Sequence, residues 1–302
     1  MIGEKLKEEI RKLYLSFDSA ESYYEKGFIW SFLTLVADLF SDDEITMMFK
    51  DISLKCLKEE KEFINDKKMH EKEINKFMKE NKKFFRNNIP KPYEIEKPIH
   101  NDLPSRKYDY LVSILESFLK TQSQYFYNFY KKMIQEERII MGKNSQVSFS
   151  SINTSKTFIF LEKFENLYDV MILVHELAHA YYYEINGERL IDRAIISNEI
   201  KDEIPSRMVE LNFIRYGGTI NLFKTYKSLK KEYDYLIYNY DQYRSNYEMM
   251  QYVIGSYLAY QLENRYQIED YFHHVYQEDF RNLILEARNK LEKENKGKVL
   301  RK

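Results

Sequence analysis

The sequence predicts a mainly α-helical protein with one small β-sheet. Its 302 residues include only eight glycines and five prolines, so few positions interrupt a helix. Apolar side chains recur at spacings of three and four along most of the chain, which is the period of helices that bury one face. Between residues 147 and 161 this period gives way to short β-branched and aromatic stretches, which are typical of strands.

The composition, with 31% charged and 44% hydrophobic residues, is that of a soluble globular protein. A formal net charge of -1 provides no basic field for nucleic acid or for an anionic membrane. The single cysteine, Cys56, excludes an internal disulfide and a Cys-x-x-Cys zinc site. The charged N-terminus is unlike a signal peptide, and the apolar region Phe28–Phe40 is too short to span a bilayer, so we expect a cytoplasmic protein.

The first part of the chain is expected to form amphipathic helices up to about Asn87, with Ser41 or Asp42 capping one of them. Four of the five prolines then fall between residues 90 and 104, where they disfavour helix and indicate a connecting loop. We therefore expect an N-terminal helical region at residues 1–98 and a second domain at residues 99–302.

Helical spacing resumes from Tyr108 to Phe118 and again from Tyr125 to about Arg138. Two short strands are predicted next, at residues 147–151 and at residues 157–161. The second predicted strand consists of Thr157, Phe158, Ile159, Phe160 and Leu161. Its edge could bind an extended peptide by adding the peptide backbone to the sheet as a further strand.

A helix is predicted from Asn166 to about Glu184, with Asn166 as its N-cap and Asp169 three positions later. Inside it lies the pattern H-E-x-x-H, formed by His175, Glu176 and His179. Histidines four positions apart project from one side of a helix, so both imidazoles can hold one Zn²⁺ ion while the glutamate acts on a metal-bound water. A hydrolytic zinc site needs a third protein ligand and keeps its fourth position for water.

The third ligand is expected to be Glu203, which follows His179 at a distance that lets the chain turn and bring a second helix against the first. This helix is predicted from Glu203 to Tyr216, with Pro205 in its first turn. Glu210 comes about two helical turns after Glu203 on the same face, so we assign it to a hydrogen bond with a ligand histidine. Glu199 and Asp202 are alternative metal donors. Further helices are predicted around residues 222–240, 246–264 and 280–291.

Five stretches taken together resemble the thimet oligopeptidase and oligoendopeptidase F family of zinc metallopeptidases. They are Gly142-Lys143, Phe158 to Val170, His175 to Ala180, Glu203 to Glu210, and Gln251 to Gly255. The resemblance implies a zincin-like, mainly helical fold with a deep channel that admits short peptides. It also implies that His175, His179 and Glu203 bind zinc and that Glu176 is the general base. Tyr252 best matches a tyrosine that stabilises the oxyanion, with Tyr247 and Tyr257 as further candidates.

The chain departs from this family in two ways. It is about half the usual family length, so the N-terminal lobe must be reduced and a second subunit could complete the channel. A histidine that commonly precedes the tyrosine region is replaced by Gln242-Tyr243. We expect a zinc metalloendopeptidase that acts on short oligopeptides. The alternatives are a peptide-binding protein that has lost turnover and a regulatory protease with one protein substrate; a structural zinc site is disfavoured, because such sites use four protein ligands.

Overall fold

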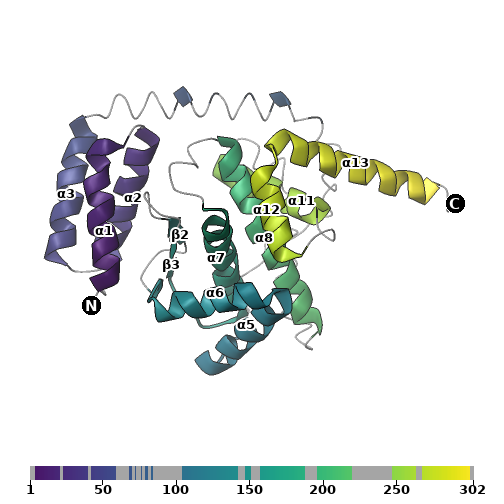
Figure 1. The fold of residues 1–302 in the computed structure, drawn as a ribbon, viewed down its shortest axis with the longest axis horizontal. Helices are drawn as coiled ribbons and strands as arrows, with labels where there is room; N and C mark the ends of the chain where they lie inside the picture. The colour runs from purple at the N-terminus through teal and green to yellow at the C-terminus, as the bar shows by residue number, and fades with distance from the viewer. Residues whose placement is uncertain are drawn as a thin grey trace. The chain divides into compact units, whose positions relative to one another are not determined.

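The computed structural model (Figure 1) describes residues 4–20, 23–39, 42–58, 104–141, 147–150, 157–187, 196–219, 247–262 and 267–299, with isolated residues between 68 and 83. The described part of the chain is mainly helical, as predicted, and its strands form a single small sheet. The proline-rich loop and the helix predicted at residues 222–240 lie outside the described residues.

Contacts within the chain divide it into two compact units that alternate along the sequence, whereas we expected one boundary near residue 98. The first unit comprises Met1–Asn81, Phe129–Lys163 and Tyr183–Ile196, and the second comprises Lys82–Asn128, Phe164–Tyr182 and Ser197–Lys302. The strands therefore group with the N-terminal helices.

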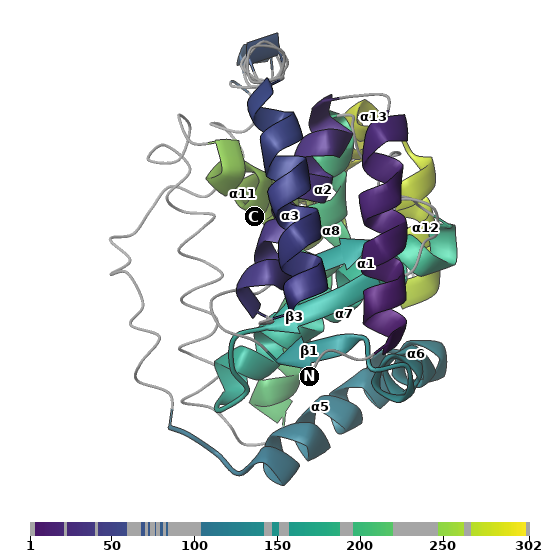
Figure 2. The same cartoon turned by 90° about the vertical axis from the view of Figure 1, so that its left-hand side faces the viewer.

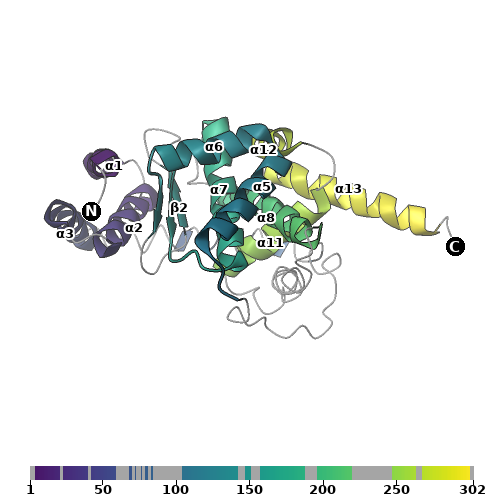
Figure 3. The same cartoon turned by 90° about the horizontal axis from the view of Figure 1, so that it is seen from below.

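Three helices and a 3-10 turn form the N-terminal part of the first unit: α1 (Glu4–Ser16), η1 (Phe17–Ser19), α2 (Tyr23–Leu39) and α3 (Asp43–Lys58). Figures 1 and 2 show α1, α2 and α3 side by side, and Figure 3 views them end-on as one group. Asp42 caps α3 as predicted, since its Oδ1 accepts hydrogen bonds from the backbone N–H groups of Glu44 and Ile45 at 3.1 and 3.3 Å. The apolar faces of these helices bury Ile10, Leu33 and Ile52 in a common core.

The sheet has three strands, β1 (Ile139–Met141), β2 (Val147–Ser150) and β3 (Thr157–Leu161), in the order β1-β3-β2. β3 pairs in parallel with β1, where Ile139 faces Ile159, and antiparallel with β2, where Phe149 faces Phe158. Every residue of β3 is buried, and the ring of Phe160 meets that of Phe32 edge-on at 6.0 Å between centroids.

The peptide-binding role predicted for residues 157–161 is therefore wrong, although the strand itself forms at the predicted residues. Adding a substrate strand requires a free row of backbone N–H and C=O groups at the edge of a sheet. β3 is instead the central strand: Ile159, Phe160 and Leu161 pair with β1, and Thr157, Phe158, Ile159 and Phe160 pair with β2. The neighbour β1 was missed because its three residues follow a helix too closely to give a strand pattern of their own.

The second unit contains the larger set of helices: α5 (Tyr108–Gln122), the start of α6 (Gln124–Gln135), most of α7 (Leu167–Asn186), nearly all of α8 (Ile196–Thr219), α11 (Tyr247–Leu262), α12 (Ile268–Gln277) and α13 (Phe280–Val299). Figures 1 and 3 show α7, α8 and α12 side by side. Aromatic contacts join α7 to two of its neighbours: Tyr181 stacks on Phe126 of α6 at 5.0 Å, and Tyr182 lies against Phe272 of α12 at 6.0 Å between centroids.

α8 begins at Ile196, seven positions before the predicted start at Glu203. Pro205 thus lies inside the helix instead of in its first turn, and it removes the N–H that would normally bond to the carbonyl of Lys201. The helix also continues through Gly217 and ends at Thr219. Glu203 consequently lies within a continuous helix, which fixes its side chain more firmly than a fraying first turn would.

Among the described residues, none of the helices combines the length and the apolar character that crossing a bilayer requires.

Candidate metal centre

Helix α7 is set in place by a reciprocal cap at its N-terminus. The side chain of Asn166 accepts hydrogen bonds from the backbone N–H groups of Tyr168 and Asp169, at 2.8 and 3.2 Å. Asp169 Oδ2 in turn accepts from the backbone N–H groups of Glu165 and Asn166, at 2.7 and 3.0 Å. This is the predicted cap, and it satisfies N–H groups that have no partner within the helix.

Beyond the cap, α7 is buried on nearly all sides, so its polar residues are withdrawn from water. The apolar residues that surround them are Leu167, Val170, Met171, Leu173, Val174, Leu177 and Ala178. His175, Glu176 and His179 are themselves buried, each with at most 8% of its surface exposed. Buried polar side chains at these positions must find partners within the protein.

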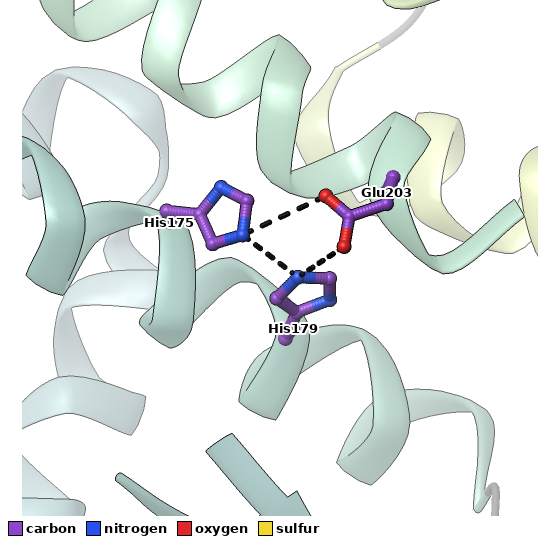
Figure 4. Close-up of side chains that lie close together, drawn as sticks. All are labelled: His175, His179 and Glu203. Carbon is purple, nitrogen blue, oxygen red and sulfur yellow. Dashed lines mark hydrogen bonds and ion pairs between the residues drawn. The ribbon is translucent and has the colours of Figure 1, made fainter. Parts of the chain in front are cut away.

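Those partners come from α8, where Glu203 faces the two histidines (Figure 4). His175 Nε2 lies 3.0 Å from His179 Nε2, and the carboxylate of Glu203 lies 3.7 Å from the first nitrogen and 3.6 Å from the second. In the part of the chain that the structure describes, this is the only such group of potential metal ligands. The structure therefore brings together the three residues that the sequence predicted as metal ligands.

The geometry of the three donors fits a divalent metal ion. In a tetrahedral zinc site with bonds of about 2.0 Å, ligand atoms lie roughly 3.3 Å apart, and the three separations here bracket that value. Glu203 Oε2 is buried and has no hydrogen-bond partner among the residues that the structure describes, although a buried carboxylate oxygen normally has one. Two imidazoles and a carboxylate are also the donor set that suits zinc.

Without a metal, the pKa values of buried residues in this cluster are shifted from their usual values. Burial by itself lowers the pKa of His175, but the carboxylates of Glu210, Glu203 and Glu176 outweigh it and raise the pKa to about 9. Burial raises the pKa of Glu203 to about 7, against the opposing charges of His175 and Arg207. These shifts reflect an excess of buried negative charge that a divalent cation would neutralise.

Glu210 contacts His175, one of the two histidines expected to bind the metal, as its position seven residues after Glu203 predicts. Its Oε1 lies 2.7 Å from His175 Nδ1, so the other ring nitrogen, Nε2, is the one that faces His179. Burial raises the pKa of Glu210, but Arg207 and His175 more than offset this and hold it below its usual value. An ionised Glu210 accepts the Nδ1 proton of His175 and leaves Nε2 available as a ligand.

Three residues next to the candidate metal ligands, Arg207, Gly255 and Ser256, were not predicted from the sequence to belong to the centre. Arg207 is buried, its Nη1 donates to Glu210, and its Nε donates to Ser256 Oγ at 2.6 Å. Gly255, beside Ser256 in α11, lies directly against Glu203. Arg207 comes four residues after Glu203 and three before Glu210, so helix geometry places all three on the same face. This spacing was the signal in the sequence that could have indicated its role.

The contact at Gly255 leads to a testable prediction. A Cβ atom at this position would lie 2.6 Å from Glu203 Cβ and 3.2 Å from the Glu203 carbonyl carbon, too close for either to remain in place. Gly255→Ala should therefore push α11 away from Glu203, destabilise the protein by about 1–3 kcal/mol and weaken binding of a metal ion such as Zn²⁺ at the centre. Denaturant unfolding and a competitive zinc titration measure the two effects.

Gly217→Ala is the matched control for this prediction, since no atom of the described residues lies within 4 Å of a Cβ added there. It replaces a glycine inside α8 with a better helix former and should stabilise the protein by up to about 1 kcal/mol without changing zinc affinity. Equal zinc affinity in Gly255→Ala and the wild type would show that the close approach does not position Glu203.

Of the three tyrosines proposed as oxyanion donors, Tyr252 is the one that the structure places at the centre. Its ring centroid lies 6.4 Å from that of His175. The carboxylate of Glu203, together with burial and the carboxylate of Glu176, raises its pKa, so its hydroxyl keeps its proton.

The other two tyrosines are not brought to the metal ligands in the same way. Tyr257 is buried, and its pKa is raised by burial against the opposing charge of Arg288, with no influence from the carboxylates of the centre. It is five positions from Tyr252 and so points from a different side of α11. Tyr247 is the first residue of α11, and its side chain lies outside what the structure describes.

Comparison with known proteins does not identify the family of this chain. No family model matches the sequence, and no curated protein matches it. A solved structure provisionally identified as oligoendopeptidase F from Bacillus anthracis str. Ames aligns over 91% of this chain with 15% identity and a TM-score of 0.43. The alignment spans 64% of the length of that protein. At this identity and TM-score, the likeness decides neither the family nor the activity of the chain.

Proposed function

We propose that this protein is a zinc-dependent metalloendopeptidase that hydrolyses peptide bonds in short oligopeptides. The observation that carries the proposal is the buried triangle of His175, His179 and Glu203, with Glu176 between the two histidines in the sequence. Three protein ligands leave one of four tetrahedral positions open, which distinguishes a hydrolytic zinc site from a structural one. The charge of the Glu176 carboxylate acts on His175, Glu203 and Tyr252, and a carboxylate in such a centre is the second group that metal-assisted hydrolysis needs.

His175 and His179 would hold the ion through their Nε2 atoms and Glu203 through its carboxylate. When bound, zinc supplies Lewis-acid activation of water and of a substrate carbonyl. The carboxylate of Glu176 accepts a proton from the attacking water and then delivers it to the leaving amine nitrogen. Glu176 is only 7% exposed, so bulk water competes little for its carboxylate oxygens.

Tyr252 would donate its hydroxyl proton in a hydrogen bond to the negative charge that develops on the carbonyl oxygen. The position of Tyr252 beside a predicted metal ligand supports this role, because its ring centroid lies 6.4 Å from that of His175. A preorganised donor of this kind typically contributes roughly 3 to 4 kcal/mol to catalysis.

A preference for short, flexible substrates is supported by the depth of the site. The side chains of His175, His179 and Glu203 are only 8% to 11% exposed, so a scissile bond reaches them only in a chain slender enough to enter the protein. A folded protein would have to unfold locally first. Oligopeptides meet this requirement without that cost.

The experiment uses the full chain, loaded with one equivalent of zinc, and a diverse library of quenched fluorescent oligopeptides. We expect cleavage at internal bonds that a chelator abolishes and added zinc restores. If the zinc-loaded protein binds peptides without cleaving any, the protein is a peptide-binding module and the proposed activity is wrong. Faster cleavage of casein than of oligopeptides would instead identify a protease for long flexible proteins and overturn the proposed substrate class.

A further inference from the structure

Arg207 lies at the centre of a hydrogen-bonded chain that joins three helices of the metal centre. Its guanidinium donates through Nε to Ser256 Oγ of α11 at 2.6 Å and through Nη1 to Glu210 Oε2 of α8. The other oxygen of Glu210 reaches His175 Nδ1 of α7 at 2.7 Å. The order of contacts is thus Ser256, Arg207, Glu210, His175, with each member buried.

A buried arginine is unusual in the core between packed helices. Arginine is among the residues least often buried, and taking its charge out of water is unfavourable unless a carboxylate is paired with it in good geometry. The Arg207 side chain is buried, with 6% of the residue exposed, and two of its N–H groups donate to Ser256 of α11 and to Glu210 of its own helix, α8. Because a guanidinium is rigid and planar, the positions of Ser256 and Glu210 are fixed relative to each other.

We propose that Arg207 is a positioning residue that, held by Ser256, fixes Glu210 and thereby orients the ring of His175 for metal binding. With both carboxylate oxygens engaged, one by Arg207 and one by His175, Glu210 cannot rotate without breaking a charged hydrogen bond. The His175 ring is then held with Nε2 toward His179 and Glu203. Replacing a residue that holds a ligand histidine typically lowers metal affinity by 10–100-fold, so the effect is measurable.

The same chain ties α11 to the centre. Ser256 follows Gly255, whose missing side chain lets α11 contact Glu203, and it lies one helical turn after Tyr252. Two adjacent residues of α11 therefore meet two positions of α8, the candidate ligand Glu203 and, one turn later, Arg207. Arg207 thus fixes the register of α11, which also carries Tyr252, against the metal ligands.

The test measures zinc affinity of the full-length protein by chelator competition, which does not depend on peptidase activity. Arg207→Gln is expected to weaken zinc binding by about 10-fold or more, and Arg207→Lys, which keeps the charge without the fork, should recover part of the loss. Ser256→Ala, a milder change that keeps the arginine, should weaken binding by less than Arg207→Gln. In the zinc-loaded wild type, the Nδ1 proton of His175 should give an exchange-protected resonance that Arg207→Gln shifts or loses.

Asn212→Ala is the matched control, because Asn212 lies on the other side of α8 and bonds to Gln122 of α5 at 2.8 Å. It should lower stability without altering zinc affinity or the His175 resonance. Zinc affinity of Arg207→Gln within about twofold of the wild type, or equal losses in Arg207→Gln and Asn212→Ala, would overturn the inference. The inference rests on the zinc site of the proposed function, but wild-type protein that binds zinc and cleaves no peptide would refute the peptidase activity alone.

Discussion

Glu176→Gln is expected to lower kcat for peptide hydrolysis by about 10³-fold, within the range typical of a lost proton-transfer group. Glutamine has nearly the size and shape of glutamate, but its amide cannot accept a proton from water near neutral pH. Because Glu176 is not one of the three grouped donors, the variant should still bind one zinc ion. The measurement is steady-state cleavage of a fluorescent peptide by protein whose zinc content has been determined.

A matched control for this variant is Glu162→Gln, which makes the same chemical change at an exposed position just after β3. It should retain wild-type kcat. Undiminished cleavage by zinc-loaded Glu176→Gln would show that another group takes the proton, and the mechanism proposed for Glu176 would fail even though the zinc site remained.

The parts of the centre that could be predicted from the sequence are those set by local spacing. His175 and His179 share a helix side because they are four positions apart, and Asn166 and Asp169 cap that helix because their side chains reach N–H groups within one turn. Glu210 could be assigned to a ligand histidine because seven positions return to the same face as Glu203. Each of these inferences requires only helix geometry.

The parts that could not be predicted depend on which segments become neighbours. The residues of β3 were placed correctly, but whether a strand is central or at an edge depends on pairing with β1 and β2. Gly255 gave no local signal for its approach to Glu203, because the contact involves a helix far along the chain. The start of α8 was misplaced because Pro205 is usual in a first turn and tolerated inside a helix only when the surrounding structure compensates for its missing hydrogen bond.

Glu203→Gln should remove most of the zinc affinity, with a loss larger than the roughly 10–100-fold typical of residues that only support a ligand. The substitution keeps the side-chain volume but replaces an anionic donor with a neutral amide. The buried carboxyl has a pKa raised to about 7 by its surroundings, so the neutral amide should leave the metal-free protein equally stable or more stable. Loss of metal binding would then be separate from loss of the fold.

Thermal unfolding with and without excess zinc measures both the stability of the metal-free protein and its affinity for zinc. A ligand that binds only the folded state raises stability by RT ln(1 + [L]/Kd), so the wild type should gain several degrees in Tm with zinc and Glu203→Gln should gain little. Asp202→Asn is the matched control, because Asp202 is a buried neighbour that the sequence left open as an alternative donor. It should keep the full zinc-dependent gain, since Asp202 lies outside the grouped ligands. The opposite pattern, with the gain lost in Asp202→Asn and kept in Glu203→Gln, would move the third ligand to Asp202 and require a different arrangement of α8 around the ion.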